Sequence, residues 1–190
     1  TLIYGQGAWF DLVDDAVVDP DHPVAMFGGA DVRTAAAMGH SRAGIWLKWR
    51  EIIDDVWTYA RQPKAYDGAE MRQLSLPRIQ LEALLPVISG ALPLVLDIDR
   101  ASDMRAAMRL ADQERLKLVF AGAEESWLIA SELARRQIPV IMQPSSQVPF
   151  SFDTLAARDD LATLLHQAGV PLIISTRGWE SIARPMAIIC

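Results

Sequence analysis

The stretch LPLVLDIDRASDMRAAMRLADQERLKLVFAG, residues 92–122, decides the fold because it places a polar segment between two short apolar runs. LPLVLDI and LKLVFAG do not alternate apolar and polar residues, which is typical of parallel strands that are covered on both faces. Residues 102–114 between them are predicted to form a helix. The stretch therefore predicts a strand, helix, strand unit with parallel strands.

The same order repeats along the rest of the chain. A helix is expected over 124–136, a strand in IPVIMQP, a helix around 159–167 and a last strand in VPLIISTRG. Strand starts near residues 93, 116, 138 and 171 have the spacing of βα units, so we expect a parallel sheet with right-handed crossovers. The predicted fold class is α/β, with a parallel sheet of about four βα units. The pattern alone does not distinguish part of a barrel from a small open sheet.

The first forty residues have a different composition, rich in glycine, aspartate and proline, which indicates turns around short apolar pieces. We expect residues 1–40 to be an irregular N-terminal segment with short strands, and residues 41–190 to be the α/β domain. Residues 41–62 carry an apolar stripe at helical spacing, and the helix is expected to end before Pro63. The stripe comprises Ile45, Trp49, Ile52, Ile53, Val56, Trp57 and Ala60.

Residues 63–90 connect this helix to the first predicted βα unit. The polar residues 63–74 are interpreted as a continued helix or a linker. In SLPRIQLEALLPVISG, Ser75 is predicted to cap a helix that has Pro77 in its first turn and Gly90 at its end. Pro86 is expected to shorten or kink that helix.

Composition excludes several classes of function. The chain has 190 residues, 51% of them hydrophobic, and a net charge of −6, the opposite sign to a nucleic-acid or anionic-membrane footprint. No apolar run is long enough for a membrane span, so we expect a soluble protein of unknown compartment. The single cysteine, Cys190, excludes disulfides and cysteine zinc sites. His22, His40 and His166 do not have metal-ligand spacing.

Polar residues follow each predicted strand, and in parallel α/β domains such strand ends form the functional site. They are Asp97, Asp99 and Arg100, then Ala121, Gly122 and Glu124, then Gln143, Ser145 and Ser146, and finally Ser175, Thr176 and Arg177. This set contains no histidine or cysteine and cannot form a nucleophilic triad. Asp97 and Asp99 are candidate ligands of a hard cation through oxygen. The candidate substrate-binding residues are Arg100, Gln143, Ser175 and Arg177.

The D-x-D pair in VLDID resembles the opening motif of the haloacid-dehalogenase-like phosphatases. That resemblance implies a nucleophile at Asp97 and an acid–base partner at Asp99, with Mg²⁺ between them and phosphate. The chain departs from the pattern at Ala101, where the family prefers threonine or valine. The acidic pair Glu124 and Glu125 also precedes Ser175 instead of following it. Despite these departures, a phosphatase that uses Asp97 and Asp99 is one alternative function.

A second resemblance covers residues 40–180. The segments SRAGIWLKWREIIDDVWTYARQP, YDGAEMRQLSLPRIQLEALLPVISGALPLVLDIDRASDM, RLKLVFAGAEESWLIASELARRQIPVIMQP and GVPLIISTRGW resemble, in this order, the middle of an amidohydrolase-superfamily protein of the imidazolonepropionase-like type. The resemblance implies part of a TIM-like (β/α)₈ barrel. It also implies metal-dependent hydrolysis of a C–N bond in a cyclic amide or peptide-like substrate, with zinc or a similar divalent metal in intact relatives.

The departures from this family concern its metal ligands. Asp97 stands where the family typically has a histidine, and Ala121–Gly122 stands where it often has H-G or E-G. Arg177 stands where the family usually has an aspartate. The segment from Arg100 to Asp103 matches the pattern, and the opening H-x-H motif is missing. We therefore expect a fragment that is inactive on its own, without a tightly bound cofactor. A non-catalytic binding or assembly module that kept the fold is the alternative.

Association is expected from the same reasoning, since a parallel sheet of about four strands leaves an unpaired edge. We predict a homodimer or larger assembly, with RPMAIIC or the helix 41–62 and its Trp46, Trp49 and Trp57 in the contact. Alternatively, the first forty residues cap the edge and leave a monomer. A small-molecule ligand is compatible with the polar strand ends, whereas no nucleic acid and no membrane span are expected.

Overall fold

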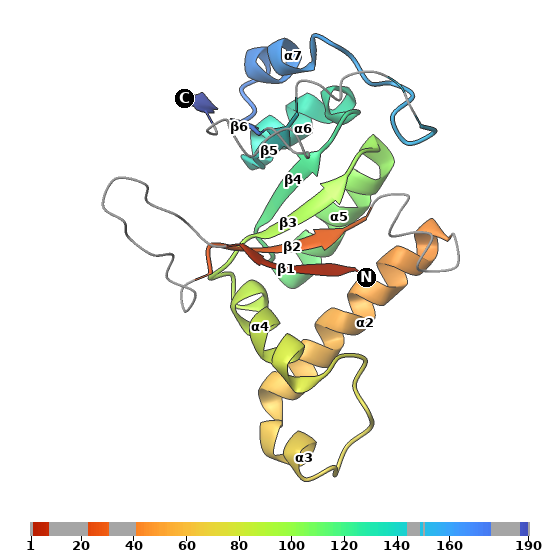
Figure 1. The fold of residues 1–190 in the computed structure, drawn as a ribbon, viewed down its shortest axis with the longest axis vertical. Helices are drawn as coiled ribbons and strands as arrows, with labels where there is room; N and C mark the ends of the chain where they lie inside the picture. Colours follow the sequence, from red (N-terminus) through yellow and green to blue (C-terminus); the bar gives the residue numbers. More distant parts are fainter. Residues whose placement is uncertain are drawn as a thin grey trace.

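A mostly parallel sheet forms the centre of the protein. The computed structural model describes residues 2–7, 23–30, 41–143, 149, 151–175 and 187–189. Within them the sheet has seven strands in the order β1 (Ile3–Gly7), β2 (Ala25–Gly29), β3 (Leu94–Ile98), β4 (Leu118–Gly122), β5 (Val140–Met142), β6 (Leu172–Ile174) and β7 (Ala187–Ile189) (Figure 1). Strands β2 to β6 are parallel, while β1 and β7 are antiparallel to their neighbours.

The four parallel strands predicted from the apolar runs, β3 to β6, are confirmed. The structure adds β2, which comes from the first forty residues and pairs in parallel with β3. The edge of β6, expected to be unpaired, is paired with β7 through the register Leu172↔Ile189 to Ile174↔Ala187. Antiparallel strands thus flank the parallel part on both sides.

Helices follow the strands as the pattern predicts. They are α2 (Arg42–Arg61), α3 (Pro63–Asp67), α4 (Arg78–Ile88), α5 (Ala101–Glu114), the 3₁₀ helix η1 (Ser126–Ile129), α6 (Ala130–Arg136) and α7 (Leu161–Gln167). The segment expected as one helix over 124–136 is divided into η1 and α6. None of the helices in the described ranges has the length and apolar character needed to cross a bilayer.

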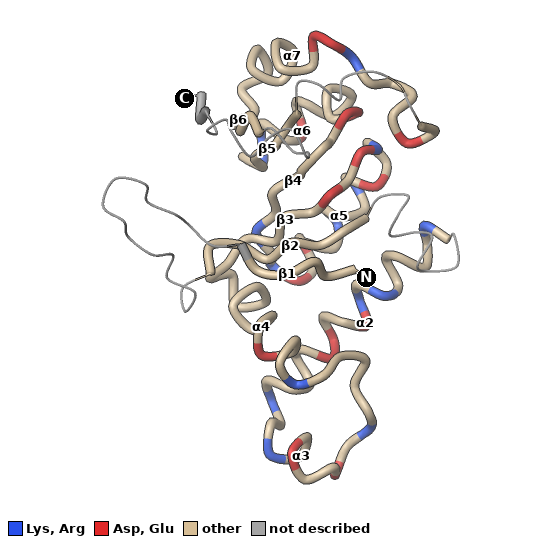
Figure 2. Tube along the Cα trace, in the orientation of Figure 1, with Lys and Arg blue, Asp and Glu red and all other residues tan. Residues whose placement is uncertain are grey.

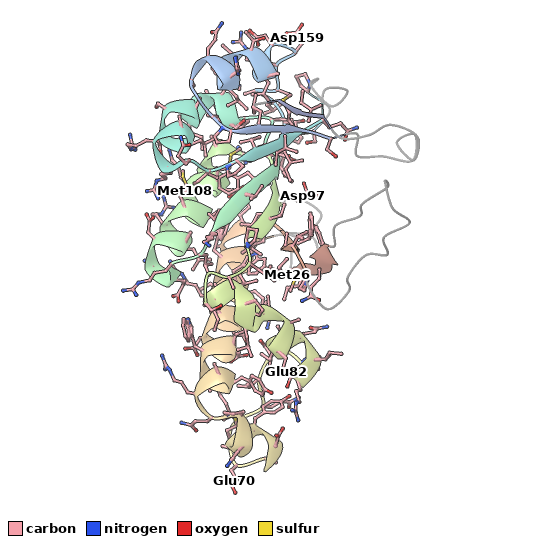
Figure 3. The ribbon with its side chains drawn as sticks, turned by 90° about the vertical axis from the view of Figure 1, so that its left-hand side faces the viewer. Met26, Glu70, Glu82, Asp97, Met108 and Asp159 are labelled. Carbon is pink, nitrogen blue, oxygen red and sulfur yellow. The ribbon has the colours of Figure 1, made fainter. Side chains whose placement is uncertain are left out.

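The two faces of the sheet are covered to different extents. Successive side chains of a strand point to opposite faces, so Leu94, Leu96 and Ile98 of β3 belong to the main core under the helices. Val95 belongs to a second, smaller cluster on the other face, together with Ala25 and Ala121. Figure 3 shows α5 on one side of the sheet and Asp97 on the other. Burial on both faces explains the unalternated apolar runs.

Helix α2 starts where the sequence predicts, because the Ser41 Oγ accepts a hydrogen bond from the Gly44 N–H at 3.2 Å. Most of the predicted stripe is buried, but Ala60 is exposed and Trp57 is half-buried. Tyr59 is buried in their place, and its hydroxyl donates to Glu82 of α4 at 2.8 Å. The prediction of the buried stripe is wrong at the C-terminal end of α2, because α4 packs against a different side of the helix there.

The prediction that Ser75 caps the next helix is wrong. Helix α4 begins at Arg78, with Pro77 in the capping position and no side-chain cap. The backbone N–H of Ser75 instead donates to the buried carboxylate of Asp55 in α2 at 2.6 Å. Pro86 lies inside α4 and does not end it before Ile88. A contact between distant parts of the chain thus determines the conformation at Ser75.

Candidate functional site

The carboxyl ends of the parallel strands form a polar rim. Asp97 of β3 is in register with Ala121 of β4. Gln143 directly follows β5, and Ser175 directly follows β6 and donates its N–H to the Met142 carbonyl at 3.0 Å. These candidate positions therefore lie along one edge of the sheet. The others named from the sequence, Ser145, Ser146, Thr176 and Arg177, lie outside the described residues, as do His22 and His40.

Three acidic side chains converge beside Gly122, where β4 ends. A Cβ atom built on Gly122 would lie 2.6 Å from Asp99 Oδ1, 3.3 Å from Glu124 Oε2 and 3.5 Å from Asp97 Oδ1. Gly122 has a φ of +81°, which disfavours other residues. We call Asp97, Asp99 and Glu124 the carboxylate cluster. Figure 2 shows acidic positions at the ends of β3 and β4.

Backbone hydrogen bonds fix the loop that carries the cluster. The Ala123 N–H donates to the Ile98 carbonyl at 2.8 Å, and the Glu125 N–H donates to the Asp99 carbonyl at 3.0 Å. The Glu125 carboxylate accepts from the Ala101 N–H, at the start of α5, at 3.1 Å. The loop after β4 is thus tied to the end of β3 and the start of α5.

Glu124 is the member of the cluster that sequence reasoning named at a strand end but did not assign a role. The residue is 5% exposed, and its Oε2 atom is buried without a hydrogen-bond partner in the structure. Buried carboxylate oxygens in native proteins normally have a partner. Asp97 is 7% exposed. The acidic pair Glu124–Glu125 after an apolar run indicates a polar strand end, but the sequence does not show that Glu124 is buried.

A second buried acidic pair lies near the start of α5. Arg42 of α2 forms ion pairs with both Asp103 and Asp153, and so joins α2, α5 and the turn at 151–154. Burial raises the pKa of Asp103, against the lowering effect of the Arg42 guanidinium. Arg100 occupies the N-cap position of α5. Within the segment from Arg100 to Asp103, which resembles a family pattern, Asp103 thus forms the ion pair that joins α5 to α2.

The described rim does not fit a zinc-type centre. Within the described ranges, no group of three or more histidine, cysteine, aspartate or glutamate side chains is arranged to hold a metal ion. Zinc sites in proteins rely on nitrogen or sulfur ligands, and the described rim positions supply neither. His166 lies in the last turn of α7, beside the residues that precede β6. It is therefore near the amino end of β6, whereas the rim is at the carboxyl end.

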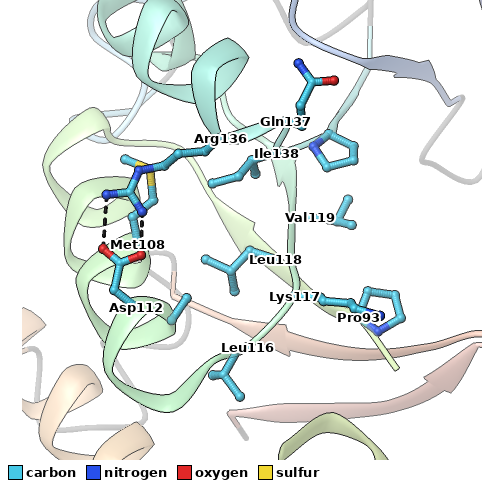
Figure 4. Close-up of a pocket in the computed structure, with 12 residues that line it drawn as sticks. Pro93, Met108, Asp112, Leu116, Lys117, Leu118, Val119, Arg136, Gln137 and Ile138 are labelled. Carbon is cyan, nitrogen blue, oxygen red and sulfur yellow. Dashed lines mark hydrogen bonds and ion pairs between the residues drawn. The ribbon is translucent and has the colours of Figure 1, made fainter. Parts of the chain in front are cut away.

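Two larger hollows lie away from the rim. One, of about 530 Å³, is bordered by Pro93, Lys117 and Pro139, which precede strands β3, β4 and β5 (Figure 4). The ion pair from Arg136 to Asp112, at 2.6 Å, lies on its wall. The other, of about 740 Å³, lies between α7 and β6 and is mostly apolar. The first lies at the amino ends of strands, where parallel α/β folds do not place their chemistry, and the second runs along the whole of β6.

Comparison with known proteins supports the fold. No family model matches this chain, and no curated protein matches it. One solved structure does, the crystal structure of an amidohydrolase from Thermotoga maritima MSB8, with a TM-score of 0.76 and 18% sequence identity. The match covers 96% of this chain and 49% of that one, so this chain spans about half the length of that protein. The chain therefore has an amidohydrolase-like α/β fold.

Proposed function

We propose that this chain is one half of an amidohydrolase-like (β/α)₈ barrel, of the imidazolonepropionase-like type, and carries substrate-binding groups for hydrolysis of a C–N bond. The observation that supports this most is the likeness of fold over 96% of the chain, which includes the parallel sheet. The substrate class proposed is a cyclic amide or a peptide-like compound. The phosphatase interpretation of Asp97 and Asp99 gains no support from this likeness.

The proposed division of roles follows from the rim. Arg100, Gln143 and Ser175 lie next to the ends of three strands, where they can contact a polar substrate, and Arg177 follows in sequence. Asp97 and Asp99 are oxygen ligands suited at most to a loosely held hard cation. Water activation in such hydrolases needs a metal held by further ligands. We therefore propose that the 190 residues alone do not catalyse.

The test compares two proteins, the 190-residue chain and the product of the full open reading frame that contains it. Both are loaded with zinc or manganese and assayed on N-acyl amino acids, dipeptides and cyclic amides. We expect hydrolysis by the longer protein and none above background by the 190-residue chain. A loss of activity in the longer protein on the Arg100→Ala change, with a larger effect on KM than on kcat, would support a substrate-binding role.

The second candidate function is a binding module that has kept the fold without the chemistry. The departure from zinc-type ligands at the described rim favours it. The same assay decides between the two. If the longer protein hydrolyses none of the substrates with either metal, hydrolysis is contradicted and the binding module is favoured.

We also propose that the chain self-associates into a homodimer or larger assembly. Phe27 on the less covered sheet face is 36% exposed, and Leu47 on α2 is 65% exposed. Trp49, expected in the contact, is buried in the core, so a contact on α2 would use Leu47 and the half-buried Trp46. Light scattering at micromolar concentration should give at least twice the 21.0 kDa mass of one chain, whereas a 21.0 kDa species would contradict association.

A further inference from the structure

We propose that the carboxylate cluster of Asp97, Asp99 and Glu124 binds a small organic cation, an alkylammonium or alkylguanidinium group. The site lies between the ends of β3 and β4, beside Gly122. The inference rests on the proposed function only for the place of the site, because it requires binding and not hydrolysis.

The first argument is the convergence of charge. Three carboxylate oxygens from two neighbouring strand ends come within 3.5 Å of the point where a Gly122 side chain would begin. A side chain at Gly122 would collide with Asp99 Oδ1, so a glycine at this position allows the three oxygens to lie close together. Like charges at such a spacing repel one another, so the arrangement favours the binding of a positive group.

The second argument is the state of Glu124. Its Oε2 atom is buried and accepts no hydrogen bond, although the residue is only 5% exposed and its oxygen points to the same space as the two aspartates. A buried carboxylate without a partner destabilises the protein, so a donor supplied by a ligand would stabilise it. A cationic N–H donor would form a charge-assisted hydrogen bond with this oxygen.

The spacing favours an organic cation over a bare metal ion. Hard divalent cations need oxygen ligands at about 2.0–2.6 Å, and no described group of three acidic side chains is arranged for this. N–H···O hydrogen bonds are about 2.7–3.2 Å long, so a polyatomic cation reaches oxygens that lie further apart. An ammonium group has three donors and a guanidinium group has five, enough for three carboxylates.

The surface next to the cluster suits the rest of such a ligand. Val95 lies two residues before Asp97 on the same face of β3, and Phe27 of β2 is in register with it. Phe27 is 36% exposed. A short hydrocarbon chain attached to the cation can therefore contact the Phe27 ring while the charged group contacts the carboxylates.

The experiment titrates the 190-residue chain with butylammonium and butylguanidinium at constant ionic strength, with butanol and butyrate as neutral and anionic controls. Binding is followed by the amide NMR signals of Gly122 and Ala123. We expect saturable shifts with one or both cations and none with the controls.

Glu124→Gln should weaken the affinity for these cations about tenfold, because it removes a charge-assisted hydrogen bond. Its ligand-free Tm should be equal to that of the wild type or higher, since a buried unpartnered charge is lost.

Glu51→Gln is the matched control, because it removes the same charge from an exposed position on α2. Should Glu124→Gln not fold, Asp99→Asn provides the same test. Equal affinity in the wild type and the cluster variants would overturn the proposal, as would saturable binding of butanol. Tighter saturable binding of Mg²⁺, Ca²⁺ or Mn²⁺ than of either amine would replace the organic cation with a metal. None of these outcomes depends on hydrolysis, so the failure of the proposed function would leave this result intact.

Discussion

Replacing Gly28 by valine is expected to lower the free energy of unfolding by about 3 kcal/mol, since overpacking of a filled core forces neighbouring atoms apart. A Cβ at Gly28 would lie 2.6 and 2.7 Å from two ring carbons of Trp49 and 2.9 Å from the Leu2 carbonyl oxygen. Trp49 is 2% exposed, and its indole N–H donates to the Gly29 carbonyl at 3.2 Å. The ring therefore cannot withdraw without loss of this bond. Urea denaturation followed by circular dichroism measures the effect.

Two further variants show whether the clash is the cause. Gly68→Ala places a methyl group at a φ of −80°, with its nearest neighbour at 3.3 Å, and is expected to change stability by less than about 1 kcal/mol. Trp49→Phe shortens the side chain and removes the two indole carbons that contact Gly28. Its combination with Gly28→Ala should therefore lower the free energy of unfolding by less than the sum of the two single changes. A Gly28→Val protein as stable as the wild type would show that β2 is not packed against α2 as described.

Replacing Asp55 by asparagine is expected to cost about 2 kcal/mol at pH 7, because it weakens hydrogen bonds to a buried charged group whose partner Arg72 is partly exposed. Asp55 is fully buried in α2, and its Oδ2 accepts the Ser75 N–H at 2.6 Å while Oδ1 accepts a hydrogen bond from Arg72. An amide can satisfy one of these donors, and its own N–H₂ group then faces the other.

The cost should depend on pH in a defined direction. Burial alone would raise the pKa of Asp55, but hydrogen bonds from Ser75 and Arg72 outweigh burial and hold this pKa below its usual 3.8. A carboxylate with a lowered pKa stabilises the fold fully above its unfolded pKa, and this contribution is lost as the pH falls through the folded pKa. The difference in stability between wild type and Asp55→Asn should therefore be constant at neutral pH and decrease below about pH 4.

Asp54→Asn provides the matched control for this prediction. Asp54 is adjacent, contacts the same Arg72 at 3.4 Å, and has a side chain that is 73% exposed. An exposed ion pair contributes little, so this variant should differ from the wild type by less than about 1 kcal/mol at every pH. Equal losses from Asp54→Asn and Asp55→Asn at pH 7 would contradict the assigned role of the buried carboxylate.

The sequence by itself determined the elements whose pattern is local. The stripe that includes Ile45, Trp49 and Val56 predicts α2, because helical spacing places these side chains on one face whatever the rest of the chain does. The unalternated runs around Val95 and Val119 predict parallel strands, because both faces of β3 and β4 must be apolar to be covered. The polar residues after each strand, Asp97 among them, followed from the same reasoning.

Tertiary structure alone decided which residues meet across long stretches of sequence. The short run at 25–29 joins the parallel sheet with Gly28 packed against the Trp49 ring, a contact between residues twenty-one positions apart in sequence. Glu124 becomes an unpartnered buried acid because backbone hydrogen bonds turn the loop after β4 toward β3. Residue spacing encodes which face of its own element a side chain occupies, but not which distant element covers that face, because packing free energy depends on the shape of the whole core.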